Sequence, residues 1–270
     1  MKLLVSALAT CFALALAKTS TCATSLQDKA GGSLCAVRKA PADLVKLHRQ
    51  LAAGRSEIKR RGNETTAQLP MINVDVYLHS VGSSKKSDAY LSNDTITKQM
   101  DVLNENFKPA GFKFNLKNAT WTVKDEWSSV FYNRDSMYRK LHKGGYSTLN
   151  IYFVELVDPL GSAGGSSEPT EDGKSRRPVD DGCTILGTTV PGGSHPNWNM
   201  GKTLVHEVGH WLGLLHTFSD KCDDKDHKGD FVSDTPASKE AASGCPTKQD
   251  SCPDQEGLDP VHNHMDYSDE

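Results

Sequence analysis

The sequence predicts an α/β (α+β) fold in which strands and helices form one main domain. Three observations predict it: stretches whose side chains alternate as in strands, helical stretches between them, and a His-rich amphipathic helix in the last third of the chain. The 270 residues allow one domain of about 200 residues plus appendages, which is enough to bury a core.

Strand and helix patterns follow one another along this domain. Met71–His79 alternates like a half-buried strand, and Asp94–Phe107 spaces its apolar residues as a helix does. The elements expected next are strands at Phe112–Leu116, Trp121–Val123, Leu149–Leu156 and Cys183–Leu186, a helix around Tyr138–Leu141, and a long surface loop from Gly161 to Asp181.

Residues 1–17 are predicted to be a secretory signal peptide. They combine a charged start at Met1-Lys2, an apolar run from Leu3 to Leu16 and the cleavage pattern Ala15-Leu16-Ala17. A membrane anchor is disfavoured because the segment is short and no basic cluster follows it. We therefore expect a secreted protein.

Residues 18–61 are predicted to be a leader ahead of the main domain at 62–270. A helical pattern at Asp43–Ile58 ends in Lys59-Arg60-Arg61. These basic residues are either a processing site that releases a pro-segment or ordinary cations near a helix end, where they suit the helix dipole. Both interpretations stay open.

Composition restricts the partners and the compartment. A net charge of −3 and a pI near 6.4 favour neither nucleic acid nor a membrane, and no later stretch is apolar enough to span a bilayer. Six of the seven cysteines remain once Cys11 leaves with the signal peptide, an even number that suits disulfides in an oxidising compartment. Glycosylation sequons begin at Asn63, Asn93 and Asn118.

The run His-Glu-Val-Gly-His-Trp-Leu-Gly-Leu-Leu-His carries the strongest chemical signal in the chain. On a helix His206 and His210 lie one turn apart on one face, so both imidazoles can bind one ion. Gly213 can adopt backbone conformations that end the helix sharply, which lets His216 return as a third ligand. Three imidazoles with one open position are typical of catalytic zinc, and Glu207 lies beside that position.

The rest of this helix favours a metal site over an accidental polar patch. Its apolar residues form one stripe on the side opposite the two helical histidines: Leu204, Val205, Val208, Trp211, Leu212 and Leu215. A helix with a core-facing stripe and ligands on its other side is suited to the floor of a cleft.

The run from His206 to Phe218, together with Asn263-His-Met-Asp-Tyr267, resembles the zinc motif and Met-turn of the metzincin metalloproteases. Further pieces resemble the pappalysin family, in particular its fungal extracellular members: Pro191-Gly-Gly, Asp234-Thr-Pro236, Gly244-Cys-Pro246 and Gly257-Leu-Asp-Pro260. The similarity spans roughly Met71 to the C-terminus.

The resemblance implies a metzincin-like zincin fold with a mixed twisted sheet, a long zinc-binding active-site helix and a Met-turn. The three histidines of the motif would bind Zn²⁺, and Glu207 would be the general base. Met265 would lie beneath the metal as a hydrophobic floor, and Tyr267 would point its hydroxyl at the site. His264 departs from the aromatic residue usual in the family, but we expect no ligand role for it because three histidines already satisfy the site.

The resemblance also implies a disulfide between Cys222 and Cys252. Relatives continue past the Met-turn with another cysteine and a helix, so we expect this chain to be truncated at its C-terminus. Cys245 would then lack its partner unless Cys183 replaces it, and apolar surface around Met265 would be exposed. Low stability, intermolecular disulfides and weak activity are the expected consequences.

Two features of the chain allow alternatives. Cys22 and Cys35 in the leader either present a thiolate to zinc or pair with each other, and an oxidising compartment favours the pair. The acidic segment after the motif is either a Ca²⁺ site or a solvated loop. Its residues are Asp220, Asp223, Asp224, Asp226, Asp230 and Asp234.

The sequence thus predicts a secreted, monomeric zinc metalloendopeptidase that hydrolyses peptide bonds in proteins. The alternative is a secreted module that binds zinc but is inactive. Glu207 argues against it, because a site that only binds has no use for a positioned base. The strand around Ile151, and the one around Ile185 if it lies at the sheet edge, are expected to hold substrate as an added strand.

Overall fold

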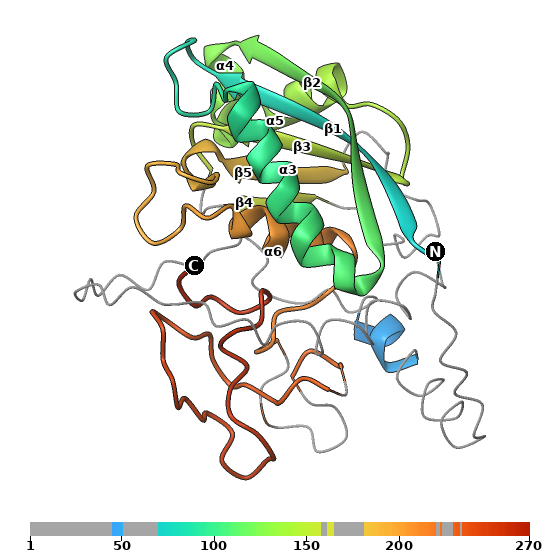
Figure 1. The fold of residues 1–270 in the computed structure, drawn as a ribbon, viewed down its shortest axis with the longest axis vertical. Coiled ribbons are helices and arrows are strands. Elements are labelled where there is room, and N and C mark those ends of the chain that lie inside the picture. Colours follow the sequence, from blue (N-terminus) through green and yellow to red (C-terminus); the bar gives the residue numbers. More distant parts are fainter. Residues whose placement is uncertain are drawn as a thin grey trace.

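Figure 1 shows the fold in a computed structural model of the chain. The structure describes residues 45–50, 70–157, 161–164, 181–219, 222, 229–232 and 234–270. The predicted signal peptide, most of the leader and Asn63 lie outside these residues. Within the described part, no helix combines the length and apolar character needed to cross a bilayer.

A five-stranded sheet in the order β2-β1-β3-β5-β4 forms the upper part of the molecule in Figure 1. The strands are β1 (Ile72–Gly82), β2 (Phe112–Val123), β3 (Thr148–Val154), β4 (Gly161–Gly164) and β5 (Gly182–Leu186). β2, β1, β3 and β5 run parallel, whereas β4 pairs antiparallel with β5 at one edge. The sheet is therefore mixed, with a single antiparallel edge strand among those described.

Two strand predictions are wrong. The separate strands expected at Phe112–Leu116 and Trp121–Val123 are one strand, because a register irregularity lets β2 follow β1 along its whole length. Gly161–Gly164 is expected in a surface loop but forms β4. Its Gly-Ser-Ala-Gly sequence has low strand propensity, so pairing with β5 decides its conformation. The rest of that expected loop lies outside the described residues.

The strand order also corrects the expected substrate edge. β3, which contains Ile151, lies between β1 and β5, and β5, which contains Ile185, is covered by β4. Both strands already have partners on each side, so neither presents a free edge. Among the described strands, β4 is the last at this end of the sheet.

The helices between residues 70 and 270 of the described part are α3 (Asn93–Phe107), α4 (Asp125–Ser128), α5 (Val130–Leu141) and α6 (Lys202–Trp211), with short 3-10 turns η1 (Lys108–Ala110) and η3 (Gly187–Thr189). Residues 45–50 are also helical. The helix predicted at Asp94–Phe107 is confirmed as α3, which begins where the Ser92 side chain accepts a hydrogen bond from the Thr95 backbone. The second predicted helix is longer than expected, and the backbone of Asn133 interrupts it.

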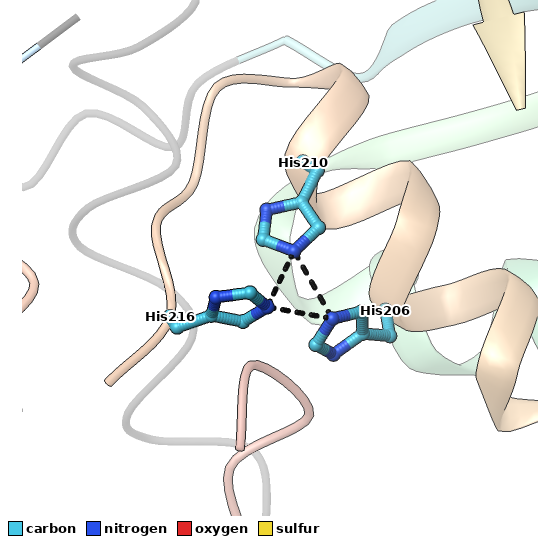
Figure 2. A group of neighbouring side chains, drawn as sticks. All are labelled: His206, His210 and His216. Atoms are coloured by element: carbon cyan, nitrogen blue, oxygen red, sulfur yellow. Dashed lines mark hydrogen bonds between the residues drawn. The ribbon is translucent and has the colours of Figure 1, made fainter. Parts of the chain in front are cut away.

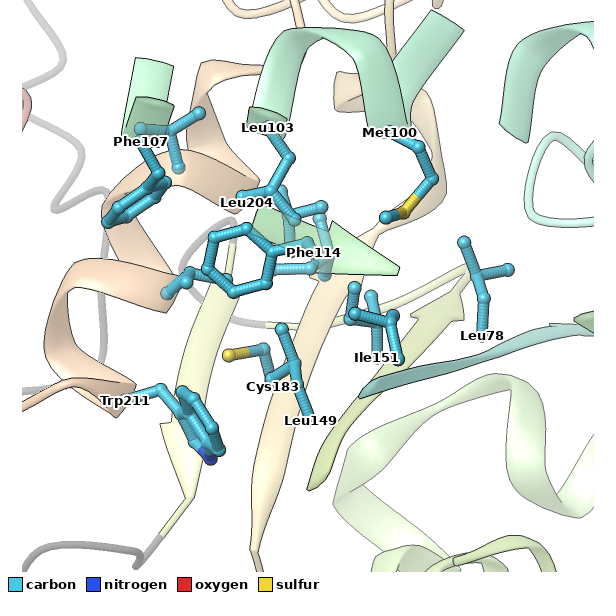
Figure 3. Packing of buried hydrophobic residues seen from close by; sticks show 14 of the residues in the cluster. Leu78, Met100, Leu103, Phe107, Phe114, Leu149, Ile151, Cys183, Leu204 and Trp211 are labelled. Atoms are coloured by element: carbon cyan, nitrogen blue, oxygen red, sulfur yellow. The ribbon is translucent and has the colours of Figure 1, made fainter. Parts of the chain in front are cut away.

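The main apolar core lies between the sheet and the two helices α3 and α6 (Figure 3). Side chains from both helices and from four strands meet there: Met100, Leu103 and Phe107 of α3, Leu204 and Trp211 of α6, and Leu78, Phe114, Leu149, Ile151 and Cys183 of the sheet. Each large apolar side chain buried there stabilises the fold by roughly 1.5–3 kcal/mol. This packing fixes α6 against the sheet.

The cysteines correct the expectation of an unpaired thiol. Cys222 and Cys252 form a disulfide with their Cα atoms 5.7 Å apart, the pairing that the family resemblance implies. Cys245 is also disulfide-bonded, to a partner outside the described residues, so the prediction that it lacks a partner is wrong. Cys183 is a free thiol buried in the core. Met265 itself is only 2% exposed, and the expected exposure of apolar surface around it stays a prediction.

The prediction that Cys245 lacks a partner failed for a physical reason. A pairing pattern carried along the sequence does not show which sulfur atoms are close in space. Because Cys245 is already disulfide-bonded, it has no free thiol with which to form the expected intermolecular disulfides.

Two of the glycosylation sequons lie on the described surface. Asn93 is exposed at the start of α3, and Asn118 is exposed on the edge strand β2. Both amides are therefore open to solvent, and their modification stays a prediction.

Candidate metal centre

Contacts from distant parts of the chain hold the N-terminus of α6. Gly201 precedes the helix with φ 81° and supplies no side-chain cap. The Glu270 carboxylate takes that place: it accepts hydrogen bonds from the backbone amides of Met200 and Thr203, the latter at 2.8 Å. A carboxylate here also suits the positive end of the helix dipole. Gln99 of α3 donates to the Gly201 carbonyl at 2.9 Å.

The turn after α6 has the conformation that the motif predicts. Gly213 has φ 99°, in the left-handed region that favours glycine. The Gly213 amide donates to the His210 carbonyl at 2.8 Å, and the Leu214 amide donates to the Gly209 carbonyl at 2.9 Å. The helix ends there, and the chain reverses toward the face that carries the first two histidines.

The structure brings the three predicted ligands together (Figure 2). His206 and His210 project from α6, and His216 reaches them from the segment after the turn. The Nε2 atoms of His206 and His210 are 3.0 Å apart, those of His210 and His216 are 3.0 Å apart, and those of His206 and His216 are 3.2 Å apart. All three side chains are buried.

The hydrogen bonds of the other ring nitrogens favour a cation between these atoms. Nδ1 of His206 lies 2.6 Å from the His264 carbonyl oxygen, and Nδ1 of His210 lies 2.8 Å from the Leu214 carbonyl oxygen. A carbonyl only accepts, so each Nδ1 carries the proton and each Nε2 presents a lone pair. Lone pairs at 3.0 Å repel unless a cation lies between them.

The spacing fits zinc. A tetrahedral zinc ion with Zn–N bonds of about 2.0–2.1 Å separates its nitrogen ligands by about 3.3 Å, close to the observed distances. Burial lowers the pKa of all three imidazoles, that of His210 to about 4, so the rings are neutral at physiological pH. Neutral imidazole is the form that binds a metal.

Other predicted residues surround this cluster. Glu207 follows the first ligand on α6 and is fully buried. The Tyr267 ring contacts the His216 ring edge-on at 4.9 Å between centroids. Met265 is buried under α6, where a Cβ atom at Gly209 would overlap the methionine sulfur. Glycine at this motif position therefore lets the methionine approach the helix.

His264 has a structural role and lies outside the metal cluster. Its Nε2 lies 2.8 Å from Oδ1 of Asn106 on α3, and its carbonyl orients the His206 ring. The three-histidine cluster does not include it. Orientation of a ligand ring through its second nitrogen is a common feature of metal sites.

Comparisons with known proteins agree with this geometry. A family model described as "Peptidase_M43: Pregnancy-associated plasma protein-A" matches residues 145–270. An extracellular metalloprotease of Pyricularia oryzae is 41% identical over 264 residues, which cover 96% of this chain and 88% of that protein. The chain belongs to the peptidase M43 (pappalysin) family.

A second fungal relative and a solved structure are also similar to this chain. An extracellular metalloprotease of Colletotrichum graminicola is 39% identical over 263 residues, covering 95% of this chain and 90% of that protein. The structure of Tannerella forsythia mature mirolysin in complex with a cleaved peptide has 26% identity and a TM-score of 0.58, with 75% of this chain and 86% of that chain covered. This M43 chain is an extracellular zinc metalloprotease with an α/β fold.

Sequence reasoning missed several residues that position the M43 metal centre. Asp181, just before β5, accepts a hydrogen bond from the Trp211 indole at 2.9 Å and so holds the end of α6. Glu270 accepts a hydrogen bond from the Thr203 amide at the start of α6, and Asn106 forms a hydrogen bond with the His264 ring. None belongs to a short motif, because each acts across a long sequence separation. Asp181 is buried, and no pattern in the neighbouring residues indicates that a buried carboxylate is needed there.

Proposed function

We propose that this chain is a secreted zinc metalloendopeptidase in which His206, His210 and His216 bind zinc and Glu207 is the general base. The observation that carries the proposal is the convergence of three buried, neutral imidazole Nε2 atoms within 3.0–3.2 Å of one another. A carboxylate adjacent in sequence and membership in a protease family support the catalytic assignment over a binding-only module.

The chemistry divides between the metal and the chain. Bound zinc lowers the pKa of water from about 15.7 to about 7 and stabilises negative charge on a peptide carbonyl oxygen. Glu207 accepts a proton from the attacking water and then transfers a proton to the departing amine nitrogen. Tyr267 donates a hydrogen bond to the carbonyl oxygen as charge develops on it. Met265, in the Met-turn, supplies an apolar floor beneath the metal site.

The substrate is proposed to be a protein chain held in extended form. Among the described strands, the antiparallel strand β4 ends the sheet next to β5, and a peptide is proposed to add there as a further strand. Mature mirolysin, at 26% identity, has been solved with a cleaved peptide, which supports a peptide ligand for this fold. The proposed organisation is a signal peptide at 1–17, a leader at 18–61 and a peptidase domain at 62–270, working as a monomer.

Metal removal tests the function directly. The secreted protein should hydrolyse casein, lose this activity on dialysis against 1,10-phenanthroline, and regain it when one equivalent of Zn²⁺ is added, because the histidines alone generate no nucleophile. Residual casein hydrolysis in metal-free protein, with zinc content verified by atomic emission, would contradict the assignment. Dialysis without chelator is the control.

Calcium is proposed as a second, structural cation in the acidic segment after the motif. Asp230 is buried and burial raises its pKa to about 8, which an adjacent cation would reverse. Asp234 lies nearby, and the other acidic residues of the segment lie outside the described residues. Millimolar Ca²⁺ should raise the melting temperature and slow autolysis, with Mg²⁺ as control. Identical melting curves with and without Ca²⁺ would remove the proposal.

A further inference from the structure

A short helical segment of the leader, residues 45–50, packs against the chain that joins the second and third histidines. His48 is 5% exposed, and its Nε2 lies 2.7 Å from the Gly213 carbonyl oxygen. A carbonyl only accepts, so the imidazole donates. Carbonyls at a helix end lack partners within the helix, and His48 satisfies one of them at the turn that follows α6.

Residues 45–50 also make apolar contacts beside this hydrogen bond. Leu215 and Phe231 form a small buried cluster, and Val45 and Leu47 of the leader pack against it. The Arg49 guanidinium lies 5.4 Å from the centroid of the Phe231 ring. Phe231 has φ 64°, a left-handed conformation that is uncommon outside glycine and depends on surrounding contacts to persist. The leader supplies part of those contacts.

These contacts lie behind the third ligand. Leu215 directs its side chain into the leader cluster, whereas the next residue, His216, turns its imidazole toward His206 and His210. One face of this segment therefore carries the metal ligand, and the other face rests on the leader. A shift of the leader would move the backbone that carries His216.

We propose that residues 45–50 form a permanent brace of the metal centre, and that His48 is a positioning residue for His216. The inference rests on the proposed role of His216 as a zinc ligand. It assigns residues 45–50 to the folded, active enzyme, because their contacts with Gly213, Leu215 and Phe231 support the segment that carries His216.

Variants of the full-length, zinc-loaded protein test the brace. His48→Leu removes the donor but keeps an apolar side chain, whereas His48→Gln keeps an N–H donor at the end of the side chain. His48→Leu should release zinc to a chromogenic chelator about 10-fold faster, the lower end of what loss of an outer-shell partner causes. It should also change the visible absorption spectrum of the cobalt-substituted enzyme. His48→Gln should restore both properties.

Two further variants keep the test decisive. Lys46→Ala changes an exposed residue of the same segment and should match the wild type in zinc release and spectrum. Leu47→Ala removes a packing contact without touching His48, and should accelerate zinc release by a smaller factor if His48→Leu fails to fold. Melting temperatures are measured for every variant, so a general loss of stability is separated from loosening of the metal.

Each outcome decides between the claims. If the wild type hydrolyses casein but His48→Leu releases zinc at the wild-type rate with an unchanged cobalt spectrum, the brace is wrong and the proposed function stands. If His48→Leu and His48→Gln lower the melting temperature equally without faster zinc release, the contact is only structural and the positioning role falls. Higher activity in His48→Leu would make the segment inhibitory, which also overturns the brace. A wild type that neither binds zinc nor cleaves casein would instead remove the proposed function.

Discussion

Glu207→Gln should lower kcat for casein hydrolysis by about 10²–10⁴-fold while the zinc content and the melting temperature stay at wild-type values. Glutamine has nearly the same size and fits the fully buried position, but it cannot accept a proton from water. The three imidazoles are unchanged, so the metal remains. Initial rates on casein, zinc by atomic emission and a thermal melt together make the measurement.

Glu240→Gln is the matched control, because Glu240 is exposed and lies outside the metal centre. It should retain wild-type activity. Turnover by Glu207→Gln within a few fold of the wild type would show that another group is the base, and loss of zinc in this variant would show that Glu207 supports the metal site itself.

His216→Ala should lose zinc on dialysis, and activity should fall with the metal. Two imidazoles on one helix remain, and the alanine leaves their third partner position open to water. The loss of affinity should exceed the roughly 10–100-fold that follows removal of an outer-shell partner, because a direct ligand is deleted. Zinc content after dialysis and activity with added Zn²⁺ are the readouts.

The control here is His262→Ala, which removes an exposed histidine between the motif and the end of the chain. Its zinc content should equal that of the wild type. Full zinc stoichiometry in His216→Ala would place the third ligand elsewhere, and His264 would be the first residue to test because its carbonyl already contacts the His206 ring.

The two variants separate chemistry from metal binding. Glu207→Gln should give a folded, zinc-loaded and inactive protein, whereas His216→Ala should give a protein whose activity follows the zinc concentration. If the site bound zinc without hydrolysing peptides, His216→Ala would still lose zinc, but neither the wild type nor any variant would cleave casein.

Features set by short-range spacing were predictable from the residues alone. The four-residue interval between His206 and His210 places both rings on one helical face, and Gly213 adopts the positive φ that the turn needs. The helix Asn93–Phe107 agrees with its predicted register because its apolar period reflects burial on one side. The same turn explains why His216 could be predicted as the third ligand, and the family motifs added the position of Met265 under the helix.

Only the tertiary structure decided the features that depend on contacts between distant segments. Gly161–Gly164 has little intrinsic strand preference and becomes β4 through pairing with β5. Cys245 is bonded although it was expected to lack the downstream partner that the family resemblance implies, and His48 reaches Gly213 across 165 positions of the chain. Local sequence determines which helix carries the ligands, because spacing along a helix is short-range. Long-range packing determines what holds that helix and its turn in place, because such partners leave no periodic pattern in the sequence.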